Sequence, residues 1–263
     1  MMQNVFTKTL YDLRWTVLAF VVGLLGLAFF IVYIYPSVAN AQGNMLGGLE
    51  PEAAKALVGN VALAGTPEGY INIQLISFAP LFLAVFLIIV TSAAIAGEDD
   101  AKTLGTLLAR PVPRWRILSE KALAICLGML VIVAALTAGA VLGAWIAGVD
   151  ISLPKLAVAV ALTVPFGIWL LGFGLFCSAL FGSRMVAALI ATGVVVFSYM
   201  LNSSTEFVHS LEQYNRFWPF YYYAWGQPMT DPIKWVNVGV LCLAGLIFFA
   251  LALVAFHRRE VSG

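Results

Sequence analysis

The residues that could do chemistry are gathered in one short stretch, residues 97–121, with the sequence GEDDAKTLGTLLARPVPRWRILSEK. This stretch holds four of the chain's 13 acidic residues and five of its 14 basic residues. Three consecutive acids, Glu98, Asp99 and Asp100, could ligate a hard cation. Adjacent residues on a helix point in different directions, however, and no histidine or further carboxylate completes a coordination shell. We therefore expect no metal site here.

The same acids fit the N-terminus of a short helix, where unpaired N–H groups and partial positive charge are exposed. Leu104, Leu107 and Leu108 follow at positions i, i+3 and i+4, which gives the predicted helix one apolar face. Pro111 ends the helix, because proline lacks the N–H that a helix interior needs. The pattern favours a docking element for a partner, with an ordinary solvated loop as the alternative.

The elements around this stretch are predicted from composition. The chain has 263 residues, of which 62% are hydrophobic and 10% are charged, and a bilayer is crossed by about 20 apolar residues in a helix. The apolar runs do not alternate as barrel strands would. The sequence therefore predicts an all-α, polytopic membrane protein in a single transmembrane domain, 1–263, with spans at about 15–35, 71–96, 122–147, 154–180, 186–201 and 235–256.

The orientation of these spans follows from the basic residues of the short loops. With the N-terminus inside, ten lysines and arginines lie on the cytosolic side and four on the other side. Six spans return the C-terminus to the cytosol. The stretch 97–121 is then a cytosolic loop between the second and third spans, and the segment 202–234 is extracytoplasmic.

Several classes of function are disfavoured by what the sequence lacks. The cores of the six predicted spans contain no Asp, Glu, Lys, Arg or His, although gradient-driven carriers usually need such groups. The phosphate-binding G-x-x-x-x-G-K-[ST] loop is absent, since Gly-Lys occurs nowhere. The two histidines fall in loops on opposite faces. Uphill transport by this chain would therefore need energy from another chain, and we expect no catalytic residues.

Uncharged polar residues lie within the spans, and most of them are expected to make helix–helix hydrogen bonds. They are Asn72, Gln74, Thr91, Ser92, Thr137, Thr163, Ser178 and Ser198. In the third span, Gly139-x-x-x-Gly143 permits close contact with a neighbouring helix. This pattern predicts internal packing.

Two flanking segments have recognisable patterns. Residues 1–14 predict an amphipathic helix lying on the cytosolic leaflet, with a simple continuation of the first span as the alternative. The segment 202–234 contains an aromatic cluster, which is interpreted either as an interfacial anchor or as an extracytoplasmic gate. The gate would comprise Trp218, Pro219, Phe220, Tyr221, Tyr222 and Tyr223.

The charged stretch also resembles a family motif. The run Glu98-x-x-x-Lys102-Thr103-Leu104-x-x-Leu107-Leu108-Ala109-Arg110-Pro111-Val112-Pro113-Arg114-Trp115 is similar to the signature of ABC type-two exporter permeases. That signature reads approximately E-x-x-x-G-T-L-x-x-L-L-x-x-P-V-x-R, and a later lysine matches Lys121. The run from Pro219 to Tyr223, followed by Pro228, resembles a second family element. Lys102 departs from the pattern, because the family usually has glycine there.

The resemblance implies a membrane permease subunit of an ATP-driven exporter. Two copies, or two related chains, would pair with two separate cytosolic ABC ATPase subunits, which would bind ATP and Mg. The chain itself would bind no cofactor, metal or nucleic acid, would not be an enzyme, and would lie among lipids of the inner (plasma) membrane. The loop 97–121 would be the coupling element, with contacts from Glu98, Asp99, Asp100, Lys102, Thr103, Leu104, Leu107, Leu108, Arg110, Pro111 and Arg114.

Two other functions remain open on the sequence alone. The chain could be an assembly or anchoring subunit of a membrane complex that transports nothing. It could also be a gradient-driven carrier whose ion site is built from carbonyls and hydroxyls. A partner with nucleotide-binding motifs distinguishes the exporter from both.

Overall fold

A computed structural model describes residues 5–46, 66–102, 112–205, 212–223, 228–229 and 232–258. Within these residues the chain is helical and contains no β-strand. Six segments are long and apolar enough to cross a membrane, and they confirm the predicted all-α polytopic fold. These segments are Val5–Asn40, Pro67–Ala94, Arg114–Ala147, Leu153–Leu180, Arg184–Ser204 and Trp235–Arg258.

Several of these spans contain more than one helix. The elements are α1 (Val5–Tyr33), α2 (Tyr35–Leu46), α5 (Pro67–Ile71), the π-helical turn η1 (Asn72–Ile76), α6 (Ala79–Ala94), α7 (Ala96–Asp100), α9 (Arg114–Ala147), α10 (Leu153–Ala161), α11 (Thr163–Leu180), α12 (Arg184–Ser204), α13 (Glu212–Asn215), α14 (Pro219–Tyr223) and α15 (Trp235–Arg258).

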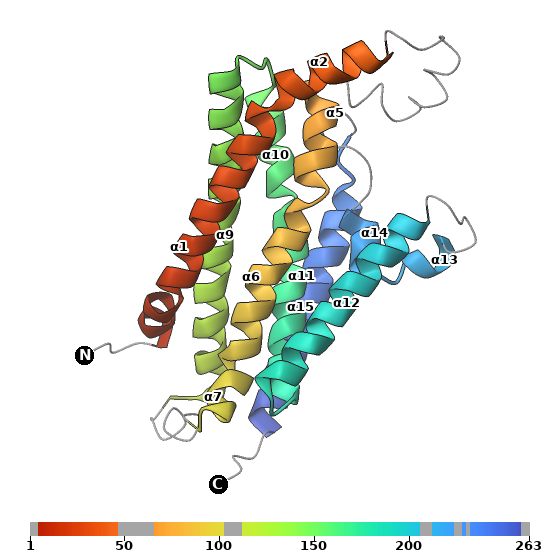
Figure 1. Ribbon diagram of the computed structural model, residues 1–263. Coiled ribbons are helices and arrows are strands. Elements are labelled where there is room, and N and C mark those ends of the chain that lie inside the picture. The colour runs from red at the N-terminus through yellow and green to blue at the C-terminus, as the bar shows by residue number, and fades with distance from the viewer. Residues whose placement is uncertain are drawn as a thin grey trace.

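The two ends of the bundle differ in what they carry (Figure 1). One end, called here the basal end, holds α7, the beginnings of α1, α9 and α12, and the end of α15. The opposite, apical end holds α2, α5 and the beginning of α10. The helices α13 and α14 lie between these levels, lower than α2 and α5 (Figure 1).

No helix boundary falls at residue 14. Residues 5–33 form the single helix α1, and the predicted place of the first residues on the cytosolic leaflet stays a prediction. No proline interrupts these residues, and no glycine occurs before Gly23, so nothing in the sequence breaks the helix there.

The long helices α1 and α9 lie against each other. The glycines of the Gly139-x-x-x-Gly143 pattern form this contact, since a Cβ atom at either would collide with main chain of α1. At Gly139 the colliding atom is the carbonyl oxygen of Leu25, and at Gly143 it is that of Phe29. The predicted packing role of this pattern is confirmed.

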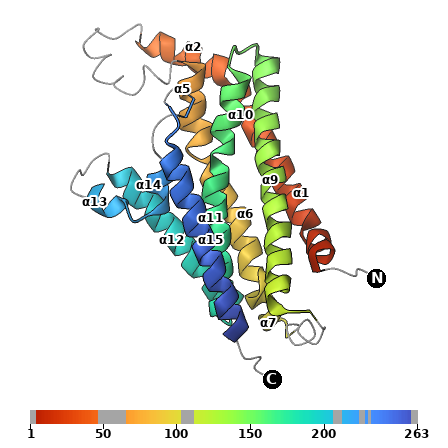
Figure 2. The same ribbon diagram turned by 180° about the vertical axis from the view of Figure 1, so that it is seen from behind.

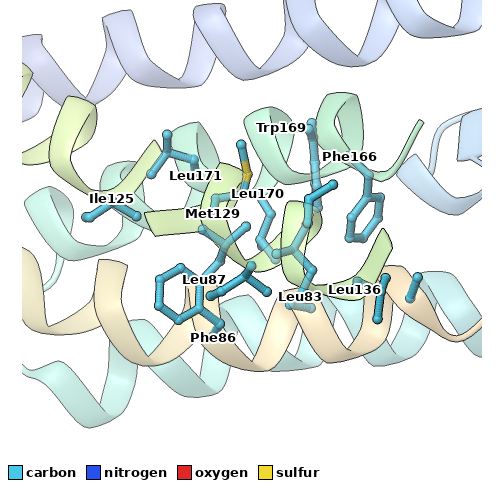
Figure 3. Packing of buried hydrophobic residues seen from close by; sticks show 14 of the residues in the cluster. Leu83, Phe86, Leu87, Ile125, Met129, Leu136, Phe166, Trp169, Leu170 and Leu171 are labelled. Carbon is cyan, nitrogen blue, oxygen red and sulfur yellow. The ribbon is translucent and has the colours of Figure 1, made fainter. Parts of the chain in front are cut away.

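The helix α11 forms the centre of the core, where it packs against α6, α9, α12 and α15. Figure 3 shows the inner faces of three of these helices meeting through Leu83, Phe86 and Leu87 of α6, Ile125, Met129 and Leu136 of α9, and Phe166, Trp169, Leu170 and Leu171 of α11. From behind, α15 runs alongside α11 (Figure 2). A Cβ atom on Gly172 of α11 would collide with the carbonyl oxygen of Gly245 of α15, so this pair of helices also needs small residues.

Candidate functional site

The charged stretch begins at a break between α6 and α7. The backbone leaves helical geometry at Ile95, where φ is −123° and ψ is −56°. The buried hydroxyl of Ser178, on α11, accepts hydrogen bonds from the N–H groups of Ile95 (3.1 Å) and Ala96 (3.0 Å). It also donates to the Ser92 carbonyl at 3.2 Å. Ser178 thus fixes the direction in which α7 leaves the second span.

Glu98 of α7 is joined to α9 by an ion pair. Its carboxylate lies 2.7 Å from the ammonium of Lys121, whose residue is only 6% exposed. The same ammonium donates to the carbonyl of Ala94, the last residue of α6, at 2.5 Å. A helix end leaves its last carbonyls without intrahelical donors, so Lys121 satisfies a group that α6 cannot. Lys121 therefore joins the end of α6, α7 and α9 in one contact.

Asp100, the last residue of α7, holds the beginning of α12. Its carboxylate accepts from the N–H of Arg184, the first residue of α12, at 2.8 Å. Ser183, which precedes α12, makes no side-chain capping bond of its own. A carboxylate at this position is favoured by the unpaired N–H groups and by the helix dipole. Asp100 acts as the cap of α12 from a different helix.

Arg114 binds the C-terminal end of a helix, α15. Its Nη1 donates to the carbonyls of Phe256 and His257 near the end of α15, each at 3.1 Å. A cation beside the last carbonyls of a helix both satisfies acceptors and opposes the partial negative charge there. Arg114 thereby fastens the beginning of α9 to the end of the last span.

Glu120 completes the set by holding the beginning of α1. One carboxylate oxygen accepts from the N–H of Phe6 at 3.1 Å, and the other pairs with Arg116 at 2.8 Å. The first N–H groups of α1 lack intrahelical partners, as at any helix start. Charged side chains of residues 97–121 are therefore bonded to the ends of α1, α6, α12 and α15. We call Asp100, Arg114, Glu120 and the Glu98–Lys121 pair the basal ties.

The backbone of Lys102 adopts a conformation that favours glycine, the residue expected there from the family signature. Its φ is +54°, and it is the one non-glycine residue with positive φ among those described. Its N–H donates to the Asp99 carbonyl at 2.8 Å, directly after α7 ends. A left-handed residue commonly closes a helix in this way, and glycine adopts it without steric cost. Lys102 closes α7 at a position that suits glycine better.

The remaining predicted residues of the coupling element are Thr103, Leu104, Leu107, Leu108, Arg110 and Pro111, and they lie outside the described residues. Asp99 is half-buried on α7, and Lys102 is exposed. The predicted contacts of Glu98 and Arg114 with an ATPase stay predictions. In the structure both side chains are already bonded within the chain.

Sequence reasoning left Glu120, Lys121, Ser178 and Arg184 out of the site. Lys121 had one signal, its place at the border of an apolar span and its match to the family's lysine. No sequence signal identified the partner of Lys121, because Ala94 is 27 residues away. The bond from Arg114 to α15 was equally hidden, since it joins residues 142 positions apart. Among the described residues, no group of three or more His, Cys, Asp or Glu is placed to hold a metal.

The aromatic cluster forms the second candidate region. Pro219, Phe220 and Tyr223 of α14 are buried, whereas Tyr221 and Tyr222 are half-buried. The Phe220 ring lies 4.8 Å from that of Phe166, and the half-buried Trp218 lies 4.8 Å from Phe197 of α12. An interfacial anchor would leave its rings at the surface. Phe220 and Tyr223 therefore pack inside the bundle, and the extracytoplasmic gate stays a prediction.

Comparison with known proteins agrees with this architecture. The family model described as "ABC-2 family transporter protein" matches residues 5–261. The chain belongs to the ABC-2 transporter family. It is thus a membrane permease subunit of an ABC transporter, and permeases of this family associate with ABC ATPase partners. None of the curated proteins compared with the permease matches it.

Proposed function

We propose that this permease exports its substrate on energy from ATP hydrolysed by a separate ABC ATPase, which engages the loop 97–121. The observation that carries the proposal is the set of basal ties. They fasten the two flanks of residues 103–111 to the ends of four other helices. A force applied between Lys102 and Val112 would therefore act on the whole basal end.

The mechanism follows from where each flank is fixed. On one side, α7 is bonded to α12 through Asp100 and to α9 through Glu98. On the other side, Arg114 and Glu120 bond α9 to α15 and α1. Closure of the ATPase on ATP would displace the loop, and the basal ties would move the spans together. The substrate would then leave through the apical side.

The assembly we propose contains two permease chains, identical or related, and two ATPase subunits that bind ATP and Mg. It lies in the inner (plasma) membrane with the basal end in the cytosol. The positive-inside bias supports this orientation, because Lys102, Arg114, Arg116, Lys121, Arg184 and Arg258 all belong to the basal end.

The test uses the permease reconstituted with its ATPase in proteoliposomes. The variants Leu107→Asp and Arg110→Glu change the loop without touching any basal tie. We expect each to weaken ATPase association by about tenfold or more, as for an interface hot spot, and to lower ATP turnover accordingly. Lys155→Glu, a charge reversal at an exposed apical residue, is the control and should change neither.

Three outcomes separate the alternatives. If association and ATP turnover are both unchanged in the loop variants, the coupling role is wrong. If the ATPase binds but ATP moves no substrate, the chain is an anchoring subunit. Transport that persists without any ATPase identifies a gradient-driven carrier.

A further inference from the structure

The second span is broken near its apical end by the π-helical turn η1. The carbonyl of Asn72 accepts from the N–H of Ser77, five residues later, at 3.0 Å. The Ser77 hydroxyl donates to the same carbonyl at 2.9 Å. Single π-turns within helices recur at functional sites, because they insert a residue and shift the hydrogen-bond register.

Pro80 deprives one carbonyl of this span of its helical donor. The backbone stays in the right-handed helical region through Ser77 and Phe78, so an N–H at position 80 would reach the Ile76 carbonyl. Proline has no N–H, and the next amide, that of Leu81, donates to Phe78 instead. In apolar surroundings an unsatisfied carbonyl costs several kcal/mol, so this carbonyl needs a donor from elsewhere.

Tyr223 of α14 supplies that donor. Its hydroxyl, from a side chain that is 8% exposed, donates to the Ile76 carbonyl at 2.6 Å. The other end of α14 is fixed to the fifth span, where the N–H of Phe220 donates to the buried hydroxyl of Ser198 at 3.2 Å. Phe220 and Tyr223 both pack against the Phe166 ring of the fourth span. The short helix α14 therefore bridges three spans.

The turn that Tyr223 holds also buries an unpaired polar group. Asn72 is 4% exposed, and neither its Nδ2 nor its Oδ1 has a hydrogen-bond partner. It lies on the buried face of η1 together with Leu75 and Ile76. A buried amide without partners disfavours the conformation that buries it. Any movement of η1 that admits a polar partner would be opposed by the Tyr223 bond and favoured by Asn72.

We infer that Tyr223 is a positioning residue that latches α14 to the proline break of the second span and so keeps the apical part of this span closed over Asn72. The inference rests on the proposed function in one respect only, namely that ATP hydrolysis by the ATPase moves the second span during transport. The latch itself is a property of the permease chain, and it can be tested without an ATPase.

The test measures access to position 72 from the apical side. Cys126, Cys177 and Cys242 are replaced by alanine, and Asn72→Cys supplies one thiol in the full-length permease in membranes. The rate of reaction with a membrane-impermeant maleimide is compared with Tyr223 intact, with Tyr223→Phe, and with Tyr223→Phe combined with Pro80→Ala. Tyr222→Phe, the same change on a half-buried neighbour in α14, is the matched control.

We expect Tyr223→Phe to raise the labelling rate about five- to tenfold, as the loss of one buried hydrogen bond would, and Tyr222→Phe to leave it within about twofold. The double variant distinguishes two roles of the Tyr223 hydroxyl, which are to fasten α14 and to supply a hydrogen-bond donor to the Ile76 carbonyl. Pro80→Ala returns an N–H to position 80, so the midpoint of thermal unfolding should recover. The labelling rate should stay high, because α14 is still unfastened.

Two results would overturn the latch. One is a Tyr223→Phe rate equal to the native rate. The other is a double variant in which the labelling rate returns to native along with the thermal midpoint, since the hydroxyl would then serve only the carbonyl. In the ATPase complex, the proposed function also requires ATP to speed labelling of the native-Tyr223 chain. If ATP has no effect while Tyr223→Phe opens the site, the proposed function fails and the latch stands.

Discussion

At the basal end, the ends of four helices are fastened by charged side chains, with the Ser178 hydroxyl at the α6–α7 break, whereas α14 is fastened by two hydroxyl groups. Asp100, Arg114 and Lys121 each bond to main-chain groups of a distant helix. Around α14 the corresponding donors and acceptors are Ser198 and Tyr223. Both regions satisfy main-chain groups that helices leave unpaired at their ends or breaks.

The difference agrees with the membrane orientation proposed above, in which the basal end lies at the cytosolic headgroups. Charged groups are tolerated at the headgroup boundary but are costly deeper in the bilayer, where hydroxyls take their place. Hydrogen bonds to charged groups contribute about 1.5–3 kcal/mol, against about 0.5–1.5 kcal/mol for neutral ones. The basal ties are therefore strong enough to stay intact while the helices move. The weaker contacts of α14 are suited to breaking and re-forming. The following predictions test that contrast.

The largest effect is expected at Lys121. Lys121→Met leaves Glu98 and the Ala94 carbonyl without their shared donor in a buried site, which should lower the free energy of unfolding by about 3–5 kcal/mol. Denaturant unfolding in detergent micelles measures this, and Glu98→Gln added to Lys121→Met should recover part of the loss. Lys155→Met at the exposed apical residue should change it by less than about 0.5 kcal/mol. If Lys121→Met and Lys155→Met change the free energy of unfolding equally, the basal ties are not the strong contacts proposed here.

An effect of opposite sign is expected at Asn72. Asn72→Leu removes two buried atoms that have no partner, so the free energy of unfolding should rise by about 2 kcal/mol. The matched change Asn202→Leu should lower it instead, because the Asn202 amide oxygen accepts from Asn215 at 3.0 Å. If both substitutions destabilise, Asn72 has a structural partner. A stabilised Asn72→Leu permease that also transports more slowly would indicate that the amide finds its partner during transport.

A smaller loss is expected at Ser198. Ser198→Ala leaves the Phe220 N–H without its acceptor and should cost about 1 kcal/mol, less than the loss of any charged tie. Thermal unfolding monitored by intrinsic fluorescence reports the change. Ser203→Ala, at an exposed position five residues further along α12, should show none. A Ser198 effect as large as that of Lys121 would contradict the proposed weakness of the α14 contacts.

The smallest effect is expected at Lys102. Lys102→Gly relieves a left-handed backbone but makes the unfolded chain more flexible, which leaves a net gain of about 0.5–1 kcal/mol. Ala101→Gly, at a neighbour with φ of −79°, should instead lower stability. The two glycine variants measured side by side therefore predict opposite shifts in the unfolding midpoint.

Local pattern was enough to predict much of this fold. Continuous apolar runs located all six spans, and the four-residue spacing of Gly139 and Gly143 identified a helix contact. Hydrogen bonds between other helices and the hydroxyls of Ser178 and Ser198, which accept from the N–H groups of Ile95 and Phe220, were also expected and are confirmed. These predictions are correct because burial and close helix contact each restrict which residue types can occupy a given position.

Long-range pairing was not predictable in the same way. The hydroxyls of Thr91, Ser92 and Thr137 each donate to a carbonyl of their own helix, and the Asn72 side chain has no hydrogen-bond partner. The expectation of interhelical side-chain bonds was therefore wrong at these four positions. The roles of Asp100, Arg114 and Glu120 depend on partners 84 to 143 residues away. No spacing rule links such positions, because the packing of six helices brings them together. The strain at Lys102 was visible only as a departure from the family pattern.

The positions of the basal ties also define how this permease can be recombined with others. All of them lie on the flanks of residues 103–111, a segment outside the described residues. A chimaera that exchanges residues 103–111 alone keeps every one of these bonds, and under the proposed function it would test which ATPase this segment recognises. A chimaera that exchanges residues 97–121 would sever bonds to four helices and would need the matching helix ends from the donor.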